Sequence, residues 1–376
     1  MSRQLSSPRT VRVLHVLNEL QASGAEVMLR SAAAHWKDHG VESHVLAVAP
    51  AIGPYAQDLR SVGYRVTHQP DIPLRRVPRQ LMQRVRAAAY DVVHLHAERG
   101  NFWFALAALG GGAKVVRTVH SVFPFCGRLR AERWVQRRTL GALGVAHVAI
   151  STSVADNEMS RFGNATHIVD NWYGSEFVPP GHRERSNARR ALGLGEHDLV
   201  AVSVGNCSSI KRHPLLLEAM AHPESPDSLV YLHVGREDET RSERRLADHL
   251  RVTDRTRFLG AGHPLKALHA ADMFVMPSSH EGLGIAAIEA LATGLPAIVT
   301  DVPGLRDLVT ASPAVMLTDA TPEAFARAMA ATVPIVARDQ RVQQTAPAIH
   351  DRFGMARGVA RYSRIYRGLL VSRRRR

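Results

Sequence analysis

Two carboxylates and two glycines, residue types that can bind hydroxyl groups and anions, lie close together in the segment MFVMPSSHEGLGIAAIEALATGLPAIVTD. Glu281 precedes the glycines and Glu289 follows them. Gly282 and Gly284 have no Cβ atom, so a ligand can approach the backbone closely. If a helix begins here, its first N–H groups form an anion-binding site. The segment therefore predicts a site for an anionic ligand.

The pattern alone leaves two alternatives open. Glu289 could face solvent, because most helical glutamates are exposed. Gly282, Gly284 and Ala287 also fit the dinucleotide fingerprint G-x-G-x-x-G/A, and Asp301 follows at about the distance expected for a ribose contact. That fingerprint indicates an NAD-dependent oxidoreductase as an alternative function.

The same segment also predicts the strands and the helix that carry these residues. Residues 273–276 are apolar and predict a strand, and residues 297–300 predict a second one. The alanine-rich stretch between them favours a helix, which Gly294 and Pro296 end. A strand, helix and strand of this kind place the turn at the carboxyl end of a strand, where open α/β sheets bind ligands.

Length, charge and cysteine content limit the class of protein. A chain of 376 residues suits two α/β domains. The formal net charge of +14 indicates anionic partners: nucleotide phosphates, an acidic membrane surface or nucleic acid. Cys126 and Cys207 lie far apart, which indicates neither a disulfide framework nor a cysteine-based zinc site and fits a reducing cytosol. We expect neither a secretory signal nor a membrane-spanning helix.

Apolar runs recur along the chain and alternate with helical patterns, which predicts two doubly wound parallel sheets. The expected strands of the first half are 11–17, 41–48, 91–96, 114–120, 147–151 and 166–170. Those of the second half are 199–204, 229–234, 256–259, 273–276, 297–300 and 314–317. The turn-rich stretch 171–180 reads as a linker. We expect an acceptor-side domain over residues 1–175 and a donor-binding domain over 176–355. A C-terminal helix would pack back on the first domain within residues 356–376, which end in a basic tail.

Several motifs together resemble one family, the retaining nucleotide-sugar glycosyltransferases of family four, which have the GT-B fold. Glu281 and Glu289 match the family's E-x7-E signature. SGAE at 23–26 resembles its N-terminal glycine-rich loop, and DVVHLH at 91–96 and VVRTVH at 115–120 resemble two strands of its first domain. VGNCSSIK at 204–211 matches the loop that opens its second domain. The resemblance covers nearly the whole chain.

The resemblance implies roles for these residues. Glu289 would accept hydrogen bonds from ribose hydroxyls, Glu281 would contact the transferred sugar, and His120 would contact it from the opposing domain across a cleft. Lys211 and backbone N–H groups would neutralise the departing diphosphate in place of a metal. The expected catalytic residues are His120, Lys211 and Glu281. The expected donor-binding residues are Gly24, Gly205, Asn206, Lys211, Arg212, Gly282, Leu283, Gly284 and Glu289. No metal and no cofactor beyond the nucleotide-sugar donor is expected.

One position departs from the family pattern. The family commonly carries arginine directly after the glycine of the second-domain loop, and here that residue is Asn206. Its loss removes one expected phosphate contact. A non-catalytic protein that resembles a glycosyltransferase therefore stays open as a second alternative.

The acceptor is expected to be a sugar, a lipid-linked molecule or a small molecule in cell-envelope, polysaccharide or glycolipid biosynthesis. Basic residues gather in the first half at Arg75, Arg76, Arg79, Arg84 and Arg86, and at Arg128, Arg130, Arg133, Arg137 and Arg138. The second run also carries Phe123, Phe125 and Trp134. These runs predict that the protein, which is expected in the cytoplasm, meets an anionic membrane surface peripherally, with a solvated basic face as the alternative. Nucleic acid is not expected, because no nucleic-acid-binding module is present.

Overall fold

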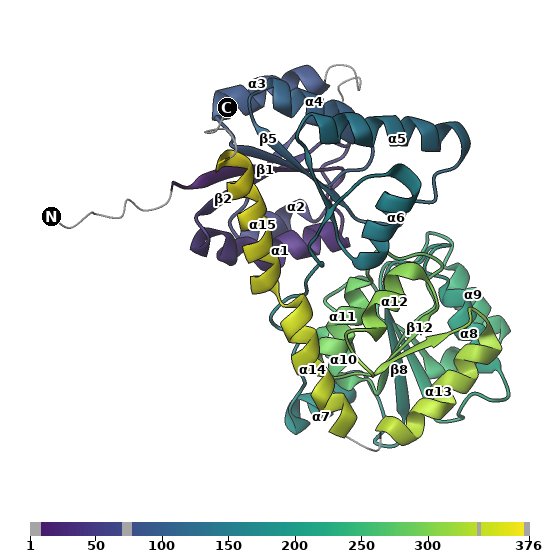
Figure 1. The fold of residues 1–376 in the computed structure, drawn as a ribbon. Coiled ribbons are helices and arrows are strands. Elements are labelled where there is room, and N and C mark those ends of the chain that lie inside the picture. The colour runs from purple at the N-terminus through teal and green to yellow at the C-terminus, as the bar shows by residue number, and fades with distance from the viewer. Residues whose placement is uncertain (1–8, 70–76, 337–339, 372–376) are drawn as a thin grey trace. The chain divides into compact units, whose positions relative to one another are not determined.

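The structure, a computed structural model, describes residues 9–69, 77–336 and 340–371 (Figure 1). The chain forms two compact units. Unit 1 comprises residues 1–174 and 355–376, and unit 2 comprises residues 175–354. Each unit is an open parallel sheet with helices between successive strands, so each is described by itself.

Unit 1 is built on a seven-stranded sheet in the order β3-β2-β1-β4-β5-β6-β7, with every neighbouring pair parallel. The strands are β1 Val11–Leu17, β2 Val41–Ala47, β3 Arg65–His68, β4 Val92–Leu95, β5 Lys114–Val119, β6 Ala146–Ala149 and β7 His167–Ile168. The helices are α1 Gly24–Asp38, α2 Ala56–Ser61, α3 Val77–Ala88, α4 Asn101–Gly110, α5 Gly127–Ala142, α6 Thr152–Phe162 and α15 Met355–Val371. The order changes direction between β1 and β4.

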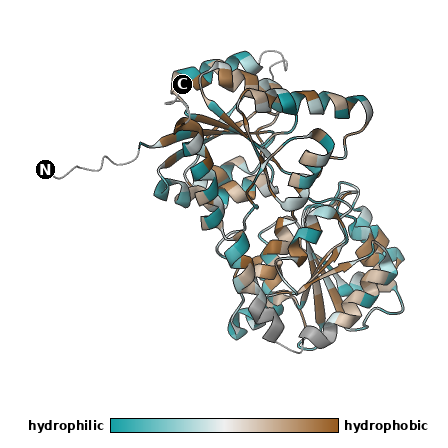
Figure 2. Ribbon diagram, in the orientation of Figure 1, coloured by the Kyte–Doolittle hydropathy of each residue, from teal (hydrophilic) through white to brown (hydrophobic). Residues whose placement is uncertain are grey.

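Both faces of this sheet are covered, as the alternation along β1 shows. Val11 and Val13 belong to an apolar core with residues of α1, α2 and α15. Leu14 and Val16 belong to a second core with residues of α3 and α4. A strand buried on both faces is apolar at nearly every position, and the strands are accordingly the most hydrophobic parts of the ribbon (Figure 2).

The C-terminal helix α15 returns to unit 1 and completes the first of these cores. Tyr366 donates or accepts a hydrogen bond with Nδ1 of His94 at 2.7 Å, and the Tyr362 hydroxyl lies 2.8 Å from Thr118 Oγ1. Gly358 lies against the indole of Trp172 so closely that a Cβ atom there would be 2.1 Å from the ring. The docking of α15 therefore depends on a missing side chain.

Unit 2 is built on a six-stranded parallel sheet in the order β10-β9-β8-β11-β12-β13. Its strands are β8 Leu199–Val204, β9 Leu229–Val234, β10 Thr256–Phe258, β11 Met273–Met276, β12 Ala297–Thr300 and β13 Val315–Thr318. Its helices are α7 His182–Ala191, α8 His213–Ala221, α9 Ser242–His249, α10 Leu265–Ala270, α11 Ile285–Ala292, α12 Pro303–Val309, α13 Pro322–Val336 and α14 Gln340–Phe353, with a 3₁₀ turn at Thr253–Arg255. Residues of α8, α9 and α13 share one apolar core with the sheet.

The predicted doubly wound α/β class is confirmed, and each strand expected from an apolar run is present with ends that differ by a few residues at most. The strand β3 was not predicted. It lies at the edge of its sheet and its residues are only partly buried, so it has no continuous apolar run. No helix within the described residues is both long enough and apolar enough to cross a membrane.

The contact between α15 and Trp172 generates a stability prediction. Gly358→Ala should lower the melting temperature, because overpacking a tight contact costs about 1–3 kcal/mol. Gly368→Ala in the same helix is the matched control, since a Cβ atom there meets no atom within 4 Å. Replacing an exposed helical glycine by alanine should leave stability unchanged or raise it. Thermal unfolding followed by circular dichroism distinguishes the two, and equal melting of both variants would contradict the close contact.

Candidate functional site

The predicted site residues of unit 2 lie at the point where the strand order changes direction. β8 and β11 are neighbours in the sheet although about 70 residues separate them in the chain. The loop after β8 spans residues 205–212 and the loop after β11 spans 277–284. Because the strands are parallel, both loops leave the same edge of the sheet. Ligand sites of open α/β sheets form at such a point.

An ion pair joins the two loops. Lys211 Nζ lies 2.7 Å from Glu281 Oε1. The side chains are 26% and 14% exposed, so the pair is partly shielded but open to a ligand. The structure therefore brings together two of the three residues that the sequence analysis expected to be catalytic, a cation and a carboxylate.

Tight backbone contacts shape the first loop. A Cβ atom on Gly235 would lie 2.0 Å from the carbonyl oxygen of Gly205, so the ends of β8 and β9 meet here without side chains. The exposed Asn206 accepts a hydrogen bond from the backbone N–H of Arg236 at 2.9 Å. The residue that stands in place of the family's arginine thus ties one loop to the next. Arg212 has φ of 50° and donates from Nε to the carbonyl of Pro277 at 2.9 Å, which ties it to the other loop.

The helix α12 packs against the second loop and against the start of α11. Gly284 is the residue before the helix, with φ of 76°, and a Cβ atom there would lie 2.7 Å from Leu305 Cδ2. A Cβ atom on Gly304 would lie 2.3 Å from the carbonyl oxygen of Glu281. The Leu283 side chain is buried in the core. Only the backbone of Gly282, Leu283 and Gly284 is therefore suited to contact a ligand, as a helix N-terminus does with an anion.

Glu289 lies on the buried face of α11, with only 6% of the residue exposed. The alternative in which it faces solvent is wrong. Burial, with a smaller contribution from the charge of Glu176, raises the pKa of Glu289 to about 8. A buried carboxyl group with so high a pKa is costly to ionise, and perturbed groups of this kind mark candidate functional sites.

In unit 1, His120 directly follows β5 and ends a row of three imidazoles, of which His15 and His96 are buried and His120 is partly exposed. His120 Nε2 lies 3.0 Å from His96 Nδ1, and His96 Nε2 lies 3.1 Å from His15 Nδ1. Burial, then the charge of Arg117, lowers the pKa of His120 to about 4, so this imidazole is neutral at neutral pH. Each contact between two neutral imidazoles shares one proton, so the tautomer of His120 depends on those of its neighbours.

His94 and His96 share a strand face, and a nitrogen of His15 lies within 4.8 Å of a nitrogen of each. The cluster is nevertheless poorly suited to a metal ion. His94 uses both ring nitrogens in hydrogen bonds, with Tyr366 and with Thr118 at 2.7 Å. His96 is likewise engaged at both nitrogens, so hydrogen bonds account for these histidines.

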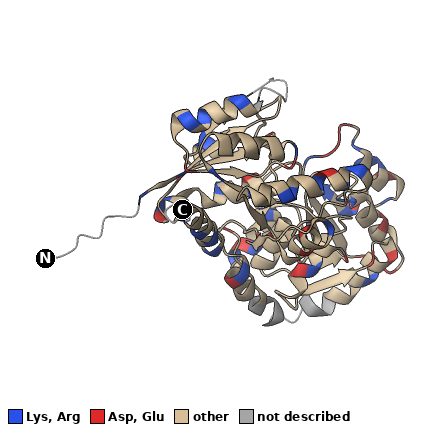
Figure 3. Ribbon diagram, turned by 45° about the horizontal axis from the view of Figure 1, so that its top comes forward, with Lys and Arg blue, Asp and Glu red and all other residues tan. Residues whose placement is uncertain are grey.

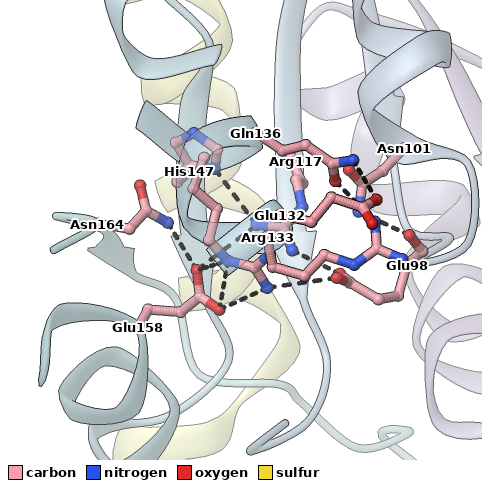
Figure 4. A network of polar contacts seen from close by, with 10 residues as sticks. Glu98, Asn101, Arg117, Glu132, Arg133, Gln136, His147, Glu158 and Asn164 are labelled. Atoms are coloured by element: carbon pink, nitrogen blue, oxygen red, sulfur yellow. Dashed lines mark hydrogen bonds and ion pairs between the residues drawn. The ribbon is translucent and has the colours of Figure 1, made fainter. Parts of the chain in front are cut away.

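A buried ionic network supports β5 and was not predicted from the sequence (Figure 4). Arg117 lies in β5 and pairs with Glu98 and Glu158. Arg137 of α5 donates three hydrogen bonds to the Glu158 carboxylate, at 2.8 Å, 2.9 Å and 3.0 Å, and its guanidinium lies 4.2 Å from the centre of the Phe162 ring. Since Arg137 is buried, it does not belong to the basic surface expected from its run. Two residues of the other expected basic run, Arg75 and Arg76, lie outside the described residues.

The last predicted residue, Gly24, is the first residue of α1 and follows the N-cap Ser23. The Ser23 hydroxyl donates to the carboxyl group of the buried Glu26. Burial raises the pKa of Glu26 to about 7, with hydrogen bonds opposing the shift. Gly24 and His120 belong to unit 1, whereas the other predicted site residues belong to unit 2.

Two protein-family models match the chain, one in each unit. The family model described as Glycosyltransferase Family 4 matches residues 22–173, and the model described as Glycosyl transferases group 1 matches residues 184–345. The chain belongs to the family-four glycosyltransferases. The NAD-dependent oxidoreductase is therefore set aside, and Asp301, assigned there to ribose, forms an exposed ion pair with Arg306.

Individual relatives agree with the family. The putative glycosyltransferase EpsF of Bacillus subtilis is 28% identical over 77% of this chain and 79% of its own length. D-inositol 3-phosphate glycosyltransferase 1 of Catenulispora acidiphila is 27% identical over 98% of both chains. Among solved structures, Anabaena Alr3699/HepE in complex with UDP and glucose superposes with a TM-score of 0.80 over 95% of this chain and 100% of its own, at 18% identity. The last comparison shows the GT-B fold.

The raised pKa of Glu289 generates a pH prediction. The folded protein keeps a proton that an unfolded chain, with the ordinary value of 4.5, releases. The free energy of unfolding therefore falls as pH rises from about 4.5 to 8. Glu289→Gln removes this titration, so the variant should melt above the wild type at pH 8, and the difference should shrink towards pH 5.

Differential scanning calorimetry across this pH range measures the effect. Glu196→Gln, at an exposed position of unit 2, is the control and should follow the wild type at every pH. A stability difference for Glu289→Gln that does not change with pH would show that Glu289 is not held protonated.

Proposed function

We propose that this protein transfers a glycosyl unit from a nucleotide-diphosphate sugar to a hydroxyl acceptor with retention of anomeric configuration. The observation that carries the proposal is the Lys211–Glu281 ion pair at 2.7 Å, with the buried Glu289 one helical segment further along the same signature. Family membership and the fold support it. Anabaena Alr3699/HepE has been solved with UDP-glucose, which supports a nucleotide sugar as the donor class.

Lys211 would act on the leaving group. A diphosphate gains negative charge as the glycosyl bond breaks, and a fixed cation stabilises that charge more in the transition state than in the ground state. The Lys211 ammonium is already held by Glu281, so little reorganisation is needed when the charge develops. The N–H groups at the start of α11 add a second set of fixed dipoles. With these groups no divalent metal is needed to neutralise the diphosphate.

The two carboxylates would orient the donor. Glu281 would contact the transferred sugar, and Glu289 would bind the ribose hydroxyls, since a carboxylate accepts hydrogen bonds at both oxygens. The pKa of Glu289 is about 8. Ribose hydroxyls that donate hydrogen bonds to the ionised carboxylate would lower this pKa, so Glu289 would lose its proton when the donor binds. In unit 1, the neutral His120 would hydrogen-bond the sugar. The acceptor hydroxyl would attack from the face that the phosphate leaves, and the phosphate would take its proton.

A lipid-linked acceptor at an anionic membrane is part of the proposal. The helix α5 presents the exposed side chains of Leu129 and Trp134, with Trp134 47% exposed, beside Arg128 and Arg138. Basic positions also recur on many other helices (Figure 3). Such a surface binds anionic headgroups, and salt weakens this binding because it screens the charges. Co-sedimentation should show binding to anionic vesicles and not to neutral ones, and equal recovery with both would overturn this part.

Substitutions at the signature test the roles directly. Glu289→Ala should weaken donor binding about ten- to a hundredfold, which corresponds to the loss of roughly 1.5–3 kcal/mol from a charge-assisted hydrogen bond. Lys211→Ala should lower kcat more than it weakens nucleotide binding, because it acts at the bond that breaks. Lys266 is an exposed lysine of α10, so Lys266→Ala is the control and should behave as the wild type.

The donor for these assays comes from a thermal-shift screen of nucleotide diphosphates and nucleotide sugars, in which a tight ligand raises the melting temperature. Isothermal titration and initial-rate measurements then separate binding from turnover. Wild-type turnover in Lys211→Ala would refute its role at the diphosphate, and unchanged donor affinity in Glu289→Ala would refute the ribose contact.

A further inference from the structure

Four side chains with metal-ligating atoms converge in unit 2 beside the first loop of the site. Cys207 lies in the loop after β8, His213 begins α8, His233 lies in β9 and Glu243 lies in the first turn of α9. One ligand atom from each lies within 4.8 Å of one from every other. Since four separate elements supply these atoms, the grouping belongs to the fold and not to one local turn.

The distances describe a group that is already assembled. Cys207 Sγ donates a hydrogen bond to Glu243 Oε2 at 2.8 Å and lies 4.0 Å from His233 Nε2. His213 Nδ1 lies 3.5 Å from Glu243 Oε1 without hydrogen-bond geometry. The two imidazole rings are 4.4 Å apart between centres.

Both imidazoles keep a nitrogen that nothing in the described part of the chain satisfies. His213, His233 and Glu243 are almost fully buried, yet Nδ1 of each histidine has no hydrogen-bond partner there. His233 Nε2 lies 2.9 Å from the carbonyl oxygen of Gly205, which fixes the proton on Nε2 and leaves a lone pair on Nδ1. Ligating histidines are typically oriented by such a carbonyl contact. A buried nitrogen without a partner is unfavourable, and a metal ion would satisfy it.

An ion can reach the group from solvent. Cys207 and Glu243 line an open hollow of about 390 Å³, together with Ser208, Arg212, Asp238 and Ser242. The two histidines are not among the residues that line it. The thiol and the carboxylate are therefore the ligands that an entering ion meets first.

We propose that Cys207, His213, His233 and Glu243 form a Zn²⁺ site. A thiolate, two imidazoles and a carboxylate are ligands that zinc prefers, and four protein ligands make a closed, structural site. Binding forms a Zn–S bond and releases the thiol proton of Cys207 to solvent. The thiolate and the Glu243 carboxylate together balance the charge of the ion. The sequence indicated no cysteine-based zinc site because the two cysteines lie far apart, whereas here a single cysteine meets ligands from three other elements.

A metal ion at this position would affect the loop that carries Lys211. Cys207 and His213 flank the stretch that carries Lys211 and Arg212. A zinc ion bound to both would tie the ends of this stretch together and fix the backbone that holds Lys211. The inference concerns a structural ion and does not rest on the proposed transfer, which needs no metal at the diphosphate.

Zinc binding by the untagged, metal-stripped full chain tests the proposal. Competition with a chromophoric chelator should give one Zn²⁺ per chain, and Co²⁺ should produce a thiolate-to-metal charge-transfer absorption. Cys207→Ser should weaken zinc binding at least about a hundredfold, since even outer-shell changes cost ten- to a hundredfold. Cys126→Ser is the matched control: Cys126 is the other cysteine, exposed and in unit 1, and its loss should change nothing.

Folding of each variant is checked by its melting temperature without metal. Zinc should raise the melting temperature of the wild type and of Cys126→Ser, but not of Cys207→Ser. Should Cys207→Ser fail to fold, Glu243→Gln carries the same test. No stoichiometric binding, equal loss of binding in both cysteine variants, or wild-type binding in Cys207→Ser would each overturn the site.

Discussion

The site of unit 2 forms because β8 and β11 are neighbours in an all-parallel sheet. Parallel neighbours deliver their following loops to one edge, so residues far apart in the chain meet there. This is how Lys211 and Glu281 come to lie 2.7 Å apart. Gly235, Gly284 and Gly304 each remove a side chain where two backbones or a helix would otherwise collide. The strand order thus brings the site residues together, and the glycines allow the surrounding segments to pack closely.

Two buried carboxylates show how burial is used differently in the two units. Glu158 is buried among Arg117, Arg137 and Asn164, and although burial alone would raise its pKa, these partners lower it. Glu289 is buried with no cation paired to it among the described residues, and its pKa rises to about 8. A carboxylate of the first kind is fully paired, and removing one of its partners would be strongly destabilising. A carboxylate of the second kind is suited to a ligand that supplies the missing donors.

The fold could be predicted from the sequence because strands buried on both faces are apolar at nearly every position, as β1 and β8 are. The spacing of Glu281 and Glu289 indicated the site. The burial of Glu289 could not be derived, since an alanine-rich helix has no clear polar face. Arg137 was assigned to a surface because its run is basic, and only tertiary structure shows its pairing with Glu158. The group around Cys207 draws on four elements, so no local spacing reveals it.

The proposed retaining transfer at Glu281 and Glu289 can be tested by the anomeric configuration of the product. The wild type would be given its nucleotide-sugar donor and an acceptor in the absence of added divalent metal, and the first-formed product would be examined by proton NMR. A retaining transfer without a required metal gives a product whose new glycosidic bond has the same anomeric configuration as the donor, formed at the same rate when Mg²⁺ or Mn²⁺ is added. A product of inverted configuration, or no product until a divalent cation is supplied, would contradict it.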